Sequence, residues 1–152
     1  MMSWTFYFLA RHPDIYAKLR DAVLQDFGSN DTAAIDYAEL MTCKYLRFVI
    51  DEVLCLAANA PMVERACKVD TILPRGGHPK GSMPILVPQG SMLYISISAI
   101  QLRADLWGPG VGEFNPERWH GRGFGWEFVP FRGGSRKYIG RISCSVLYSP
   151  GL

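Results

Sequence analysis

The sequence predicts an α+β fold that is mainly helical, in which helices come first, a small β-sheet follows and a long ordered loop comes last. Apolar residues up to position 57 recur at steps of three and four, the period of an amphipathic helix. From Pro61 the apolar residues lie in short, partly alternating segments, which is typical of strands. The segment 107–134 is rich in Gly, Pro and Trp without a sustained period, which indicates ordered irregular structure.

Two helices are predicted at the beginning of the chain. Residues 1–11 are apolar on nearly every side, so we expect them to form the end of a buried helix. Pro13 suits the first turn of a second helix over residues 13–27, and Gly28 suits its end. One stripe of this second helix is apolar at steps of four residues, which predicts that this side faces a core.

A third helix is predicted from about residue 36 or 40 to Ala57. Glu52 and Cys55 lie together on the side opposite its apolar stripe, three positions apart and able to touch. If that side is buried, the partner of the Glu52 carboxylate must be Cys55 or a residue of another segment. The apolar stripe consists of Leu46, Val49, Ile50, Val53 and Ala57.

Short strands are predicted next, with turns rich in Pro and Gly between them and a single helical turn after them. The uncharged run from Gly81 to Leu102 has the length of a membrane span, but its prolines and its strand-like second half argue against a transmembrane helix. No membrane segment is therefore expected in this chain. The predicted strands lie near 63–69, 85–88 and 92–96, the turns at 74–84 and 88–90, and the helical turn near 98–103.

The composition excludes several classes of protein. The 152 residues suffice for one domain, and 16 Lys and Arg nearly balance 14 Asp and Glu, so the surface as a whole is not built for a polyanion. With 49% hydrophobic and 20% charged residues, disorder is excluded as the main state, and we expect part of the surface to be covered by another element. The four cysteines form no C-x-x-C pair, which predicts reduced thiols rather than a zinc site or a disulfide framework.

Basic and aromatic residues alternate in the loop between residues 117 and 141. Arginine binds carboxylates and phosphates, and aromatic rings stack on planar groups, so this loop suits an anion with a flat ring system. Single-stranded nucleic acid and a planar cofactor that bears carboxylates both meet this description. A third interpretation is a solvated loop whose aromatic side chains fill the core. The aromatic residues are Trp119, Phe124, Trp126, Phe128, Phe131 and Tyr138.

Three motifs follow one another: Glu52-Val-Leu-Cys55 near a helix end, then Phe114-Asn-Pro-Glu-Arg118-Trp119, then Pro130-Phe131-Arg-Gly-Gly134-Ser-Arg136-Lys-Tyr138-Ile-Gly140. Together they resemble the C-terminal part of a cytochrome P450, a haem-thiolate monooxygenase. The resemblance implies that residues 1–140 form a partial cytochrome P450 domain with the haem-side helices, the small sheet and the cysteine-loop region. Leu73-Pro-Arg-Gly-Gly77 and Leu106-Trp-Gly-Pro109 resemble fungal fatty-acid and alkane hydroxylases in particular.

The resemblance implies a function and a cofactor. The reaction would be an O2-dependent hydroxylation of a lipophilic substrate, with haem as the cofactor and electrons from an NADPH-dependent reductase; no nucleic acid is expected as a partner. Arg65 and Arg136 match family positions that hold the haem propionates, and Gln101 stands where a histidine is common. The cofactor-binding residues implied for the loop are Phe131, Gly134 and Gly140.

Two departures from the family pattern predict that this chain is inactive. Cys55 replaces the arginine of the Glu-x-x-Arg motif, so a buried Glu52 must rely on Arg118 alone or stay protonated. Tyr138 stands at the metal-ligand position, in place of the cysteine whose thiolate pushes electron density onto the haem iron. We therefore expect no catalytic residues in this chain.

The resemblance ends at Gly140, and residues 141–152 are expected to be a divergent tail. These features predict a truncated or decayed gene product, or a partial gene model, that lacks the part of the family in which an N-terminal membrane anchor would lie. The alternative is a non-catalytic module that binds nucleic acid through the loop 117–141.

Overall fold

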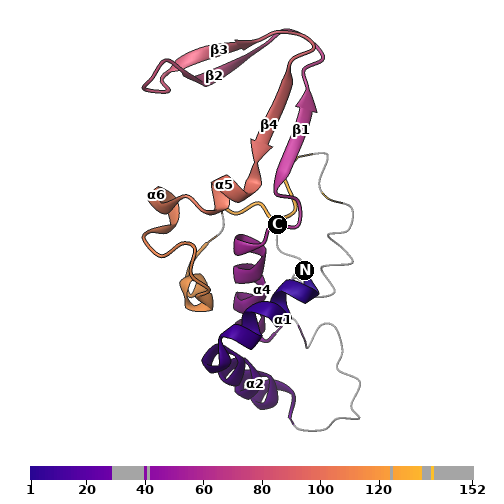
Figure 1. Ribbon diagram of the computed structural model, residues 1–152, viewed down its shortest axis with the longest axis vertical. Coiled ribbons are helices and arrows are strands. Elements are labelled where there is room, and N and C mark those ends of the chain that lie inside the picture. Colours follow the sequence, from indigo (N-terminus) through magenta and orange to yellow (C-terminus); the bar gives the residue numbers. More distant parts are fainter. Residues whose placement is uncertain (29–39, 41, 124, 135–137, 139–152) are drawn as a thin grey trace. The chain divides into compact units, whose positions relative to one another are not determined.

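The computed structural model of the chain describes residues 1–28, 40, 42–123, 125–134 and 138. They form two compact units, of which one consists of Met1–Pro61 with the residues from Ile97 onward, and the other of Met62–Ser96. Helices dominate the first unit and antiparallel strands make up the second, which confirms the predicted α+β class (Figure 1).

Helix α1 spans Met2–Arg11 and helix α2 spans Pro13–Phe27, which confirms the break predicted before Pro13. Gly28 ends α2 with a φ of 75°, in the left-handed region that favours glycine.

The prediction that residues 1–11 form a buried helix is wrong. Leu9 is the one buried residue of α1, because only one side of this helix packs against α2 and α4. On its other sides Trp4, Phe6 and Tyr7 have exposed fractions of 49%, 65% and 48%. The apolar residues of α1 therefore form an exposed surface of this chain.

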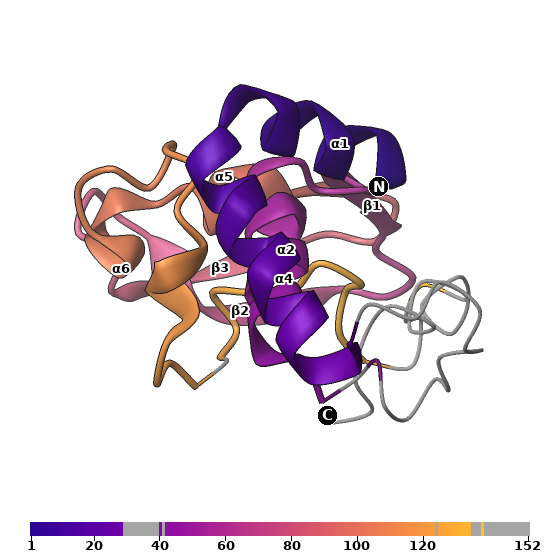
Figure 2. The ribbon, with the colours of Figure 1, turned by 90° about the horizontal axis from the view of Figure 1, so that it is seen from below.

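Helix α4 spans Lys44–Leu56 and packs against both α1 and α2, as the view along the molecule in Figure 2 shows. It begins later than predicted, because Cys43 has an extended backbone with φ of −69° and ψ of 94°. Residues 36–39, where one predicted start lies, are outside the described residues. All residues from Val49 to Cys55 are buried. The middle of the predicted apolar stripe and the side that carries Glu52 therefore both face the interior.

Two hydrophobic clusters surround α4. In one, Val49 and Val53 contact Leu9 and Phe114. The half-buried Ile15 and Leu19 of α2 pack against this cluster. In the other, Ile50 and Leu54 contact aromatic residues from the C-terminal part of the chain, which are Trp107, Trp119, Phe128 and Phe131. Helix α4 is thus the centre of the first unit.

The second unit contains two antiparallel strand pairs rather than one sheet: β1 (Met62–Ala66) pairs with β4 (Met92–Ser96), and β2 (Thr71–Gly77) pairs with β3 (Met83–Val87). The prediction of a turn over 74–84 is wrong for 74–77, which belong to β2, and for 83–84, which belong to β3. Pro74 and the following glycines suggest a turn, but the register of β2 shifts between Leu73 and Gly77. Such an irregularity tolerates proline within a strand.

Two short helices and a largely irregular segment follow the strands. Helix α5 spans Ile97–Gln101, close to the predicted helical turn, and α6 spans Ala104–Trp107. A 3-10 helix, η1 (Pro116–Trp119), interrupts the predicted irregular segment, and the Asn115 side chain caps it by accepting the Glu117 N–H at 3.1 Å. In the part of the chain that the structure describes, no helix is long and apolar enough to cross a membrane.

Candidate functional site

A buried carboxylate on α4 holds the segment around η1 against this helix. The side chain of Glu52 is fully buried, and its Oε1 accepts the backbone N–H of Asn115 at 2.8 Å. Its Oε2 accepts the indole N–H of Trp119 at 2.9 Å and forms an ion pair with Nε of Arg118 at 3.0 Å. The partners of Glu52 therefore come from another segment and not from Cys55.

Arg118 connects this carboxylate to the backbone that precedes η1. Its Nη2 donates hydrogen bonds to the carbonyl oxygens of Gly110 at 3.0 Å and Glu113 at 2.7 Å. The Arg118 side chain is only 12% exposed, so solvent screens its interaction with Glu52 weakly. One guanidinium thus fixes the path of the chain from residue 110 to residue 118.

Glu52 holds its proton more strongly in the folded chain than a glutamate does in water. Burial raises the pKa of Glu52 to about 7, although the hydrogen bond from Asn115, the charge of Arg118 and the hydrogen bond from Trp119 act in the opposite direction. Of the two predicted alternatives, reliance on Arg118 alone is wrong, because two neutral donors assist. The other, a protonated Glu52, is favoured by the raised pKa. Of the two donors, only the Trp119 indole had a signal in the sequence, namely its place in the motif that contains Arg118.

Cys55 takes part in a separate set of neutral hydrogen bonds. Its thiol donates to the carbonyl oxygen of Gln101 at 3.4 Å, and the buried Gln101 side chain donates to the carbonyl oxygens of Leu54 at 2.8 Å and Cys55 at 3.1 Å. Burial raises the pKa of Cys55 to about 12, so the thiol stays neutral. Position 55 therefore joins α4 to α5 and supplies no charge to Glu52.

The loop that carries Tyr138 is attached to the core through Phe131. The Tyr138 backbone N–H donates to the carbonyl oxygen of Phe131 at 3.0 Å, and the two rings stack with centroids 6.5 Å apart and an interplanar angle of 21°. Phe131 is buried beside α4, whereas the Tyr138 side chain is 44% exposed. Gly134, between them, has a φ of 78° that suits glycine.

Of the remaining residues predicted to bind a cofactor, the structure describes only Arg65. Arg136 and Gly140 lie outside the described residues. Arg65 lies on β1 in the second unit, where its Nη1 donates to the carbonyl oxygen of Glu64 at 2.7 Å. The assignment of Arg65 and Arg136 to haem propionates therefore stays a prediction.

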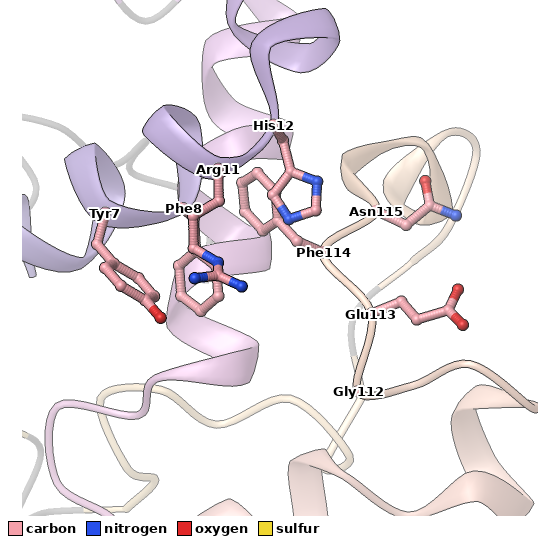
Figure 3. A pocket seen from close by; sticks show the side chains of 8 residues that line it. All are labelled: Tyr7, Phe8, Arg11, His12, Gly112, Glu113, Phe114 and Asn115. Atoms are coloured by element: carbon pink, nitrogen blue, oxygen red, sulfur yellow. The ribbon is translucent and has the colours of Figure 1, made fainter.

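A pocket of about 500 Å³ lies between the end of α1 and residues 112–115 (Figure 3). Its apolar side is formed by Phe8 and Phe114, whose rings stack with centroids 4.9 Å apart. Sequence reasoning missed this pocket, because its two sides come from distant segments and neither contains a motif by itself. The polar or charged side chains that line it are Tyr7, Arg11, His12, Glu113 and Asn115.

A helix with a buried glutamate, bound to a Pro-Glu-Arg-Trp segment and followed by a Gly-rich loop, is the arrangement expected for haem-thiolate monooxygenases. The family model of cytochrome P450 matches residues 1–142, and the chain belongs to this family.

Curated relatives from fungi support the same assignment. Cytochrome P450 monooxygenase g430 from Fusarium sp is 46% identical over 141 residues, which cover 92% of this chain and 25% of that protein. Cytochrome P450 52E1 from Candida apicola is 41% identical over 145 residues, which cover 93% and 28%. Cytochrome P450 monooxygenase alt2 from Alternaria solani is 43% identical over 146 residues, which cover 93% and 27%. The chain thus spans about a quarter of the length of these relatives.

The match confirms the resemblance that the three motifs indicate. Membership of the family implies haem as the cofactor of the complete enzymes. Among the residues that the structure describes, no group of three or more His, Cys, Asp and Glu side chains could hold a metal ion. Three of the cysteines, Cys43, Cys55 and Cys67, are free.

Proposed function

We propose that this chain is the haem-side part of a cytochrome P450 domain, over residues 1–140 with a divergent tail at 141–152, and that it does not catalyse monooxygenation. The observation that carries this proposal is Tyr138, which stands where the resemblance expects the thiolate ligand. When haem is bound through a thiolate, the thiolate pushes electron density onto the iron and so favours cleavage of the O–O bond. The phenol of Tyr138 does not donate electron density to the iron as a cysteine thiolate does.

The residues around Tyr138 do not fit a thiolate-bound haem. The side chain offers a phenol oxygen, which lies farther from the backbone than a cysteine sulfur would. Its ring stacks on Phe131, and its backbone N–H is bound to the carbonyl of the same residue. Phe131 itself is packed into the core beside α4. We therefore derive no reaction step through haem in this chain.

One ion pair of the arrangement that the resemblance implies is present, whereas the arginine at position 55 is replaced by cysteine. Glu52 and Arg118 are paired at 3.0 Å, and Arg118 holds the backbone at Gly110 and Glu113. These contacts support a role as a scaffold for the loop that follows. For the ancestral reaction we propose a lipophilic substrate such as a fatty acid or an alkane, with electrons from an NADPH-dependent reductase.

The test is a product assay with the full chain. The chain is mixed with haemin, an NADPH-dependent cytochrome P450 reductase and a long-chain fatty acid or alkane, and hydroxylated product is measured by mass spectrometry. We expect no more product than from haemin and reductase without the chain, while an active cytochrome P450 in parallel confirms that the assay works. Product above the haemin background would overturn the proposal.

The alternative function, binding of nucleic acid through the loop 117–141, is weakened because three of its six aromatic residues are buried, although Trp126 and Tyr138 are 78% and 44% exposed. Trp119, Phe128 and Phe131 have exposed fractions of 2%, 4% and 6%, so their ring faces are occupied within the core and cannot stack on bases. This supports the interpretation that these aromatic side chains fill the core. Titration with poly(U) is expected to leave the tryptophan fluorescence unchanged.

A further inference from the structure

The guanidinium of Arg11 lies at the pocket between α1 and residues 112–115 (Figure 3). Its Cζ lies 5.5 Å from the centroid of the Tyr7 ring, one turn earlier on α1. Among the residues that the structure describes, Arg11 forms neither a salt bridge nor a side-chain hydrogen bond. The contact with Tyr7 thus positions the charge, while the N–H groups of the guanidinium stay available to a ligand.

Aromatic rings form the wall of the pocket next to this cation. Phe8 and Phe114 stack on each other, and the His12 ring lies 5.2 Å from that of Phe114, as Figure 3 shows. Tyr7 is 48% exposed and Phe8 is half-buried, so both rings still have surface that a ligand can cover. The volume of about 500 Å³ lies within the usual range for small-molecule sites, about 300–1,000 Å³.

We propose that this pocket binds a small aromatic carboxylate. The guanidinium of Arg11 would bind the carboxylate, because its planar fork of N–H groups matches the two oxygens. The ring system of the ligand would pack against Tyr7 and Phe8 and so leave water. All residues that line the pocket belong to the helical unit, and the proposal does not depend on whether the chain holds haem.

The charges around the pocket favour a carboxylate over a phosphate. A phosphate monoester carries about −1.5 to −2 charges at pH 7, and proteins commonly recognise it with a cluster of arginines. Arg11 is the one arginine or lysine among the residues that line this pocket. Glu113 lines it as well, and its carboxylate points away from Arg11, so it adds a negative charge to the rim without neutralising the guanidinium (Figure 3). A ligand with a single negative charge therefore matches the pocket better.

Titration of the full chain with 2-naphthoate tests the proposal, and the broadening of the ligand signals in the proton NMR spectrum measures binding. The alcohol 2-naphthalenemethanol, which has the same rings without the charge, should bind about tenfold more weakly. The dianion 2-naphthyl phosphate should also bind more weakly. No binding of 2-naphthoate, or equal binding of the acid and the alcohol, would overturn the proposal. Tighter binding of the phosphate would overturn the assignment to a carboxylate.

Variants on α1 test the two groups that recognise the ligand. Arg11→Gln should weaken binding of 2-naphthoate about tenfold, and Arg11→Lys, which keeps the charge but not the fork, should weaken it less. Tyr7→Phe keeps the ring beside the guanidinium and should bind like the unmodified chain, whereas Tyr7→Leu should bind about threefold more weakly. Arg20→Gln is the matched control, since it removes the same charge from an exposed site on α2 outside the pocket. Equal losses in Arg11→Gln and Arg20→Gln would contradict the proposal.

The NMR signals of His12 locate the ligand independently of its affinity. The chain has three histidines, His12, His78 and His120, of which only His12 lines the pocket. Ring currents of bound 2-naphthoate should shift the imidazole C–H signals of His12 and leave those of the other two histidines in place. The signals that disappear in a His12→Gln variant provide the assignment. Binding that leaves the His12 signals unshifted would place the ligand elsewhere and overturn the proposal.

Discussion

Replacement of Arg118 by alanine would leave the buried carboxylate of Glu52 with two neutral donors, the Asn115 backbone N–H and the Trp119 indole. The Arg118 side chain is 12% exposed and its Nε lies 3.0 Å from Oε2 of Glu52, so the loss corresponds to breaking a buried ion pair, about 3–5 kcal/mol. The carbonyls of Gly110 and Glu113 lose their donor as well, at about 1 kcal/mol each. Against a typical folding free energy of about 5–15 kcal/mol, this loss is large.

Urea unfolding at pH 8, where Glu52 is mostly ionised, measures this loss through tryptophan fluorescence. The same substitution in a Glu52→Gln background should cost clearly less, because the carboxylate has then lost its charge. Arg103→Ala is the control, since Arg103 pairs with Asp105 on the exposed surface and should change stability little. An Arg118→Ala protein as stable as the control, or an equal loss in both backgrounds, would refute the role assigned to this pair.

Three further predictions concern the Glu52 carboxylate, the neighbouring Cys55 and the exposed helix α1. The free energy of unfolding should fall by about 3 kcal/mol as the pH rises from 4.5 to 7. The reason is that the folded chain keeps Glu52 protonated to about pH 7, whereas the unfolded chain releases this proton near pH 4.5. Urea unfolding measures this pH profile, and Glu52→Gln should flatten it. Cys55→Arg should bring a second cation near Glu52 and move the pH-dependent loss of stability to lower pH, whereas Cys55→Ser should leave it in place. Identical pH profiles of the two variants would contradict the proximity of the side chains at positions 52 and 55. The exposed aromatic residues of α1 should bind the dye ANS strongly, and Phe6→Ser should weaken the fluorescence of the bound dye. Absence of an ANS signal from the unmodified chain would contradict the exposure of this helix.

Local signals in the sequence were sufficient for most of the helical part. Pro13 and Gly28 mark the bounds of α2 because they act on the backbone at their own positions. The start of α4 was placed too early, because apolar residues before Lys44 continue the helical pattern although the backbone of Cys43 is extended. Strand β2 was missed for the opposite reason: its ladder tolerates a proline and two glycines that in isolation are typical of a turn.

The site shows where reasoning from motifs ends. Glu52 and Arg118 were paired in advance because both belong to motifs of the family, and the structure places them 3.0 Å apart. The backbone N–H of Asn115 could not be foreseen, since any residue carries this group and only the fold aims it at Glu52. The exposure of α1 depends on which other elements pack against it, and the hydrophobicity of its own residues does not predict that.

The absorption spectrum of the reduced carbonyl complex tests the central claim most directly. The full chain is mixed with haemin, reduced and exposed to carbon monoxide, alongside Tyr138→Cys and Tyr138→Phe variants. We expect no red-shifted Soret band of a thiolate-bound carbonyl complex from the unmodified chain or from Tyr138→Phe, and at most a partial band from Tyr138→Cys. A clear thiolate band from the unmodified chain would mean that one of its own cysteines reaches the iron, and would contradict the conclusion that this chain lacks the ligand for monooxygenation.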